Sequence, residues 1–142
     1  MRKVEAFAPL IEEAFSNNQT FKMPVNGVSM LPFLNKTHYV VLAKPQNLKR
    51  NDMILYKREN GQYVLHRIFR VKKDHFQLLG DNQVYREYPV YENQVIGKVI
   101  EVHKGNKIHH LNGFKYKTYL FFWNFRLLRL LCFPFTRRKK IK

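Results

Sequence analysis

The 142-residue sequence has one cysteine, Cys132, which excludes an internal disulfide framework and leaves the redox compartment open. Its opening residues do not resemble a secretory signal, because three glutamates follow within a helical pattern. The apolar run between Lys117 and Arg126 is too short to cross a bilayer, which takes about 20 apolar residues. No internal repeat or low-complexity linker occurs. These absences favour one ordinary domain with its own hydrophobic core.

Acidic residues are scarce, and the formal net charge is +16. Residues 114–142 contain nine Lys/Arg and no acid, while the other 113 residues carry the remaining 17 Lys/Arg and all 10 Asp/Glu. The excess charge fits an anionic membrane surface or a nucleic acid as partner, and composition alone does not choose between them.

Hydrophobic periodicity predicts a mainly β fold with a short helix at each end. Residues 3–16 have the spacing of an amphipathic helix, which Pro9 bends or interrupts. Further on, short strand-like runs alternate with turn residues, and Asn60-Gly61 is a hairpin signal. The expected strands are 21–25, 39–43, 53–56, 63–71, 76–79 and 95–102. They predict a compact antiparallel β domain over residues 1–113.

Residues 114–142 form a separate basic, aromatic-rich segment. One interpretation is an amphipathic helix lying in the membrane interface, with Trp123 and neighbouring Phe and Leu side chains inserted and Arg126 and Arg129 reaching the headgroups. The alternative is a terminal helix that packs on the domain or on another subunit. The sequence favours neither.

Ser29 has the surroundings of a nucleophile. Gly27 permits positive φ or a close approach, Pro32 stiffens the chain after the turn, and Met30 is expected to pack beneath. A serine needs a base within hydrogen-bond reach, and His66 in a strand-like run can supply one.

These residues carry a resemblance to the superfamily that joins type I signal peptidases and LexA-like self-cleaving repressors. Five segments resemble its conserved boxes in the same order: 27–32 (Gly-Val-Ser-Met-Leu-Pro), 51–55, 65–68 (Leu-His-Arg-Ile), 79–82 (Leu-Gly-Asp-Asn) and 95–99. A histidine followed by arginine is similar to the endoplasmic-reticulum and archaeal subtype. The membrane-spanning helix of signal peptidases proper has no counterpart near the start of this chain.

The resemblance implies Ser29 as nucleophile, His66 as general base, and Asp81 or Glu87 as the acid. Asp81 matches the Gly-Asp-Asn box residue for residue. Glu87 stands where the histidine subtype has an aspartate. Gly27, Met30 and Pro32 are the expected substrate-binding residues, and the resemblance implies cleavage after small residues.

No cofactor or metal is expected, since His109-His110 lacks a partnering Cys or well-spaced acid. The leading hypothesis is a cytoplasmic serine endopeptidase that removes a leader or signal-like segment from a peptide or protein, with peripheral attachment at the inner face of a membrane as an open alternative. The alternatives are a LexA-like domain that cleaves its own chain, and a non-catalytic basic module that binds a membrane, a partner or, less expectedly, nucleic acid.

Overall fold

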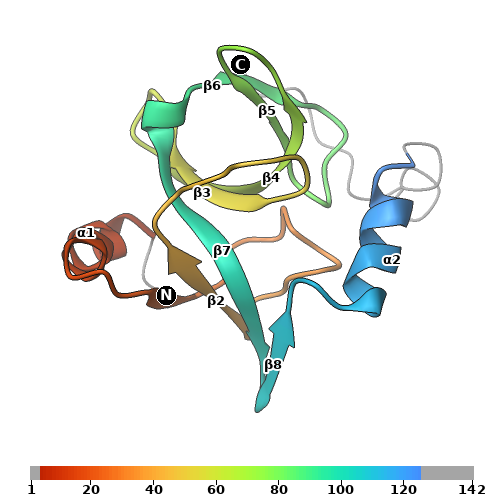
Figure 1. The fold of residues 1–142 in the computed structure, drawn as a ribbon, viewed down its shortest axis with the longest axis horizontal. Coiled ribbons are helices and arrows are strands. Elements are labelled where there is room, and N and C mark those ends of the chain that lie inside the picture. Colours follow the sequence, from red (N-terminus) through yellow and green to blue (C-terminus); the bar gives the residue numbers. More distant parts are fainter. Residues whose placement is uncertain (1–3, 126–142) are drawn as a thin grey trace.

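The computed structural model describes residues 4–125 (Figure 1). Its strands form one strongly curved antiparallel sheet in the order β1-β2-β7-β3-β4-β5-β6, with β8 also paired to β7. The strands are β1 (Phe21–Pro24), β2 (His38–Ala43), β3 (Met53–Lys57), β4 (Tyr63–Val71), β5 (Phe76–Leu79), β6 (Glu87–Val90), β7 (Val95–Lys104) and β8 (Lys107–His110). The helices are η1 (Val4–Phe7), α1 (Ala8–Ser16), η2 (Glu92–Gln94) and α2 (Phe114–Trp123).

The predicted mainly β architecture is confirmed. Strands β4 and β5 have the expected bounds. Gly61, at φ +91°, lies in the turn of the predicted hairpin between β3 and β4, in which Lys57 pairs with Tyr63. Pro9 lies at the beginning of α1, where its missing N–H costs nothing, and η1 precedes it. Two strands were not predicted from the sequence: β6, which contains Pro89, and β8, whose residues are all exposed and lack apolar alternation.

The long strand β7 joins the two halves of the sheet. Its first residues pair with β3, and its later residues pair with β2 on one side and β8 on the other. In Figure 1, β3 to β6 curl together at the top, while α1 and α2 lie on opposite sides of the molecule. Register shifts in β2 and β3 beside β7 accompany this bend.

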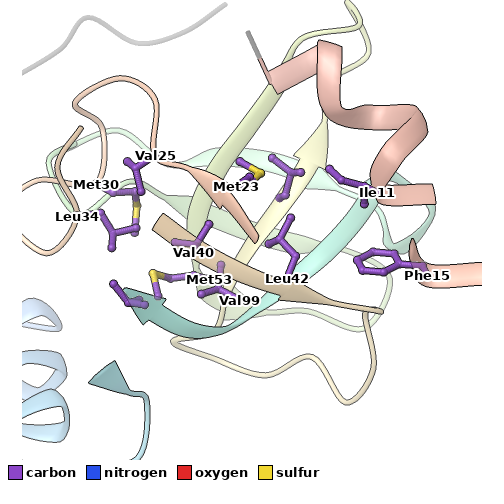
Figure 2. Close-up of a cluster of buried hydrophobic side chains, with 12 residues drawn as sticks. Ile11, Phe15, Met23, Val25, Met30, Leu34, Val40, Leu42, Met53 and Val99 are labelled. Carbon is purple, nitrogen blue, oxygen red and sulfur yellow. The ribbon is translucent and has the colours of Figure 1, made fainter. Parts of the chain in front are cut away.

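The main hydrophobic core anchors the segment that carries Ser29. Val25, Met30 and Leu34 of that segment are almost fully buried together with residues of α1, β1, β2, β3 and β7 (Figure 2). Each fully buried side chain of this kind contributes about 1.5–3 kcal/mol relative to exposure. The core therefore holds both ends of the loop and leaves Ser29 at its surface.

Helix α2 packs on the domain through an ion pair that is completely buried. The Arg67 guanidinium donates to both carboxylate oxygens of Asp81, at 2.8 and 2.9 Å, and both side chains are inaccessible to solvent. Tyr116, Tyr119 and Trp123 of α2 surround this guanidinium with their rings, and the Tyr119 hydroxyl donates to Asp81 at 2.7 Å.

The sequence left two interpretations of the C-terminal segment. The inner side of α2 agrees with the interpretation in which the helix packs on the domain. The predicted domain division at residue 113 coincides with the beginning of α2 and stays a prediction. Residues 126–142, where the segment continues, lie outside the described residues. Within residues 4–125, no helix has the length and apolar character needed to cross a bilayer.

Arg67→Ala should lower the free energy of unfolding by about 3–5 kcal/mol, because it leaves the buried Asp81 carboxylate without its counter-charge. Urea unfolding followed by circular dichroism measures this. Arg70→Ala is the matched control, since Arg70 is an exposed arginine of the same strand. Equal unfolding midpoints for the two variants would contradict the role of the ion pair.

Candidate functional site

Ser29 lies on a tight turn between β1 and β2. Gly27 precedes it at φ +82°, a conformation that side chains other than glycine rarely adopt. The Leu31 N–H then donates to the Val28 carbonyl at 3.2 Å, and the Leu34 N–H donates to the Met30 carbonyl at 2.9 Å. The turn leaves Ser29 partly exposed between the exposed Val28 and the buried Met30.

The Gly80-Asp81-Asn82 turn braces Ser29 from behind. The Asn82 backbone N–H donates to the Ser29 carbonyl at 2.8 Å, and its side-chain amide donates to the Val28 carbonyl at 3.0 Å. A Cβ atom on Gly80 would stand 2.6 Å from the Ser29 carbonyl oxygen. Residue 80 is therefore glycine because the serine turn approaches its backbone too closely for any side chain.

Ser29 and His66 line the same cavity, which has a volume of about 250 Å³. Gly27 and the buried Gln83 line it as well. The half of β4 before Arg67 forms another wall, and in the described pairings β5 joins β4 only from Arg67 onward. Before Arg67, the edge of β4 that faces away from β3 therefore lies next to the serine turn.

His66 is 1% exposed, and its Nδ1 atom lies 3.2 Å from the Tyr56 hydroxyl. Burial raises the pKa of the Tyr56 phenol, and the charge and hydrogen bond of Glu87 raise it further. Glu87 is held in turn by Arg58, whose Nε lies 3.0 Å from each carboxylate oxygen and whose Nη2 lies 2.7 Å from Oε1. Burial opposes the charge on Arg58, but Glu87 outweighs it and raises the pKa of this guanidinium.

Tyr56 lies between His66 and Glu87. Its hydroxyl shares a hydrogen bond with His66 Nδ1, and the tautomer of the imidazole decides which of the two donates. Glu87 acts on the same phenol, since its charge raises the pKa of Tyr56.

The two candidate acids occupy different places. His66 and Arg67 are consecutive on β4 and point to opposite faces of the sheet. Both carboxylate oxygens of Asp81 accept hydrogen bonds from Arg67, so Asp81 lies on the Arg67 side of the sheet. There it also accepts a hydrogen bond from Tyr119 of α2. Glu87 lies on the His66 side, with Tyr56 between them.

The structure also places the expected substrate-binding residues. Gly27 lines the cavity beside Ser29. Met30 is 3% exposed and belongs to the core, where it supports the turn from beneath. Pro32 is exposed and follows a cis peptide bond from Leu31. Of the three, Gly27 is the one positioned to meet a bound peptide.

Sequence reasoning missed Tyr56, Arg58 and Gln83. The hairpin signal at Asn60-Gly61 could have found Tyr56, because the register it sets pairs Ile54 with His66. Tyr56 is two residues beyond Ile54 and therefore lies diagonally across from His66 on the same face. Nothing in the sequence distinguishes Gln83 from an ordinary turn residue. Among residues 4–125, no three His, Cys, Asp or Glu side chains gather in a way that could hold a metal ion.

Residues 2–100 match the Peptidase S24-like family. This match covers more than half of the chain, and the protein belongs to that family. The chain is also similar to the LexA repressor of Halalkalibacterium halodurans, with 26% identity over 103 residues. That stretch is 72% of this chain and 49% of the relative, so the chain spans about half the length of the repressor. The fold and the family together define a LexA-like, serine peptidase-like domain.

Gly80→Ala should displace the Ser29 turn, since the added methyl group would lie 2.6 Å from the Ser29 carbonyl oxygen. We expect a stability loss of about 1–3 kcal/mol and weaker labelling of Ser29 by a serine-directed acylating probe, read by mass spectrometry. Gly113→Ala is the control, because a Cβ there meets open space at ordinary φ. Normal labelling of the Gly80 variant would contradict the close-packing explanation.

Proposed function

We propose that the chain is a serine endopeptidase of the histidine-base subtype, with Ser29 as nucleophile and His66 as general base. The observation that carries this proposal is the single cavity lined by both residues, with His66 backed by Tyr56, Glu87 and Arg58. A histidine with a purely structural role in the core would need neither a hydrogen bond from Nδ1 to such a series of side chains nor a cavity shared with a serine. The family match is consistent with peptidase chemistry.

The proposed mechanism is acyl transfer. Ser29 Oγ attacks the scissile carbonyl carbon while His66 Nε2 takes the hydroxyl proton. The Ser29 backbone N–H stabilises the oxyanion, an interaction commonly worth about 3 kcal/mol of the barrier. His66 then protonates the leaving amine, and a water molecule activated by the same nitrogen releases the acyl group and restores Ser29.

The proposed substrate is a leader or signal-like segment bound in an extended conformation. The edge of β4 before Arg67 can pair with such a peptide by strand addition and deliver its scissile bond to Ser29. Gln83 lines the same cavity and uses its side-chain oxygen to accept the Gly80 N–H at 3.2 Å. Its amide nitrogen is a candidate second donor for the oxyanion or the peptide backbone. Cleavage after small residues follows from the family resemblance alone.

Self-cleavage is the second candidate, and it rests on the similarity to the LexA repressor. Val4 of η1 also lines the cavity, so the N-terminal part of this chain lies beside the proposed nucleophile. In this case the substrate would be a segment of the same polypeptide, and the roles of Ser29 and His66 would not change.

A serine-directed acylating probe should label Ser29 in the wild-type protein and fail to do so in Ser29→Ala. In His66→Ala, labelling should fall by about 10²–10⁴-fold, the usual contribution of a general base. Ser16→Ala is the matched control, because Ser16 is the only other serine of the sequence and ends α1 in an exposed position. Peptide mapping by mass spectrometry identifies the labelled serine.

Equal labelling of the wild-type and His66→Ala proteins would refute the catalytic pair and favour a non-catalytic module. The same preparation, incubated without added substrate, separates the two peptidase candidates. An intact mass that does not change supports a separate peptide substrate. Fragments that appear in the wild type and are absent from Ser29→Ala support self-cleavage.

Tyr56→Phe should slow acylation of Ser29 by about tenfold, because the lost hydrogen bond to His66 Nδ1 no longer favours the reactive tautomer. Glu87→Gln should act in the same direction, since the amide can donate to Tyr56 and reverse the order of the hydrogen bonds. Tyr63→Phe is the control: it lines the same cavity but belongs to the other face of β4. Acylation rates that stay unchanged in both variants would show that His66 does not depend on this chain of groups.

A further inference from the structure

Helix α2 carries aromatic side chains on two opposite sides. Tyr116, Tyr119 and Trp123 recur at helical spacing on the inner side and face the Arg67 guanidinium. Phe114 and Phe121 recur on the outer side, 85% and 57% exposed. Phe125, just beyond the helix, extends this outer row with 52% exposure, and its ring lies 4.9 Å from that of Phe121.

This outer row has no aromatic partner elsewhere among the described residues, and its rings at Phe121 and Phe125 are in contact. Phe122 lies beside it, with its ring 5.5 Å from Phe121 and half of its surface exposed. Isolated exposed apolar residues are ordinary, whereas four neighbouring phenylalanines indicate an interaction surface. We call Phe114, Phe121, Phe122 and Phe125 the outer phenylalanine face.

Positive charge borders this face on both sides. At about 100° per residue, Lys115 and Lys117 lie on opposite flanks of the row that contains Phe114. Lys117 also lines a cavity of about 440 Å³ with Lys49, Arg50 and Lys98. Asp52, 3.4 Å from Lys98, is the acid of that cavity, and the sequence from 114 to 142 contains none.

We propose that the outer phenylalanine face seats the protein on an anionic lipid surface while the inner face of α2 stays docked on the β domain. Phenylalanine rings enter the boundary between headgroups and acyl chains, and flanking lysines extend to the phosphates. A second copy of the chain would bring two acid-free cationic helices together, which charge repulsion disfavours. The proposal goes beyond the proposed peptidase function and does not depend on it.

The contacts of α2 allow its inner side to stay packed on the β domain while its outer side contacts lipid. The inner side is fixed by Arg67, Asp81 and Phe33, whose ring stacks on Tyr119 with centroids 5.1 Å apart. None of these contacts involves the outer row. The domain therefore need not release α2 in order to bind lipid, and the cavity that contains Ser29 would stay intact on the membrane.

The first test is vesicle co-sedimentation of the full chain. We expect binding to phosphatidylcholine vesicles that contain phosphatidylglycerol, and little binding to phosphatidylcholine alone. The combined variant Phe114→Ser, Phe121→Ser and Phe125→Ser should bind at least tenfold more weakly. The combined control Tyr85→Ser, Tyr88→Ser and Tyr91→Ser removes three exposed aromatics from another part of the surface and should bind like the wild type.

The second test concerns the flanking charges. Lys115→Gln with Lys117→Gln should weaken binding to the anionic vesicles by roughly tenfold, and added salt should reduce the difference. Lys72→Gln with Lys73→Gln is the matched control, because these exposed lysines lie after β4. Equal losses in the two lysine pairs would point to net charge alone and overturn the assignment to α2.

Trp123 reports whether α2 stays docked, since it is the single tryptophan and is 3% exposed. Its fluorescence emission should not shift when vesicles are added. A shift would mean that α2 leaves the domain and would overturn the proposal. The proposal would also be overturned if the wild-type protein did not bind anionic vesicles, or if the phenylalanine variant bound them normally. It would be overturned as well if that variant lost self-association or single-stranded nucleic-acid binding instead.

Discussion

The bidentate contact between Arg67 and Asp81 is the interaction on which the arrangement depends. It joins β4, the Gly80-Asp81-Asn82 turn and α2 at one fully buried point. The neighbouring residues do the proposed chemistry: His66 precedes Arg67 on β4, and Asn82 follows Asp81 and bonds to the Ser29 carbonyl. Because a buried ion pair tolerates little displacement of either partner, this contact sets the distance between the strand that carries the histidine and the turn that braces the serine.

The same geometry separates the two candidate acids. Consecutive residues of a strand point to opposite faces, so an acid that neutralises Arg67 is directed away from His66. Asp81 stabilises the scaffold, and Glu87 reaches the imidazole through Tyr56. The Tyr56 hydroxyl lies between this acid and the imidazole, and it shares a hydrogen bond with His66 Nδ1. Arg58 forms an ion pair with Glu87, with 2.7 Å between Nη2 and Oε1.

The sequence predicted the parts of the molecule that local chemistry determines. The strands around His66, the hairpin at Asn60-Gly61 and the interrupted N-terminal helix follow from alternation, turn residues and Pro9. The ordered boxes indicated Ser29 and His66, which the fold brings to one cavity. The role of Tyr56 could not be predicted from composition, because it depends on a cross-strand register. Strand β8 could not be predicted because it has no apolar face, and its pairing with β7 keeps it in the sheet. Choosing between Asp81 and Glu87 required knowing which face of β4 each one approaches.

The sequence predicted a helix in the C-terminal segment but did not decide what it packs against, because both sides of α2 are aromatic. Among the described residues, the side of α2 that is covered is the one facing Arg67. The inner rings have a specific reason to be there: a buried guanidinium is stabilised by aromatic faces at the 5.4 to 5.9 Å separations seen for Trp123, Tyr116 and Tyr119. The outer phenylalanines serve no such cation. Their exposure to water is unfavourable, and the proposed lipid surface would cover them. The proposed membrane surface, with its anionic headgroups, would contact both the phenylalanines and the lysines beside them.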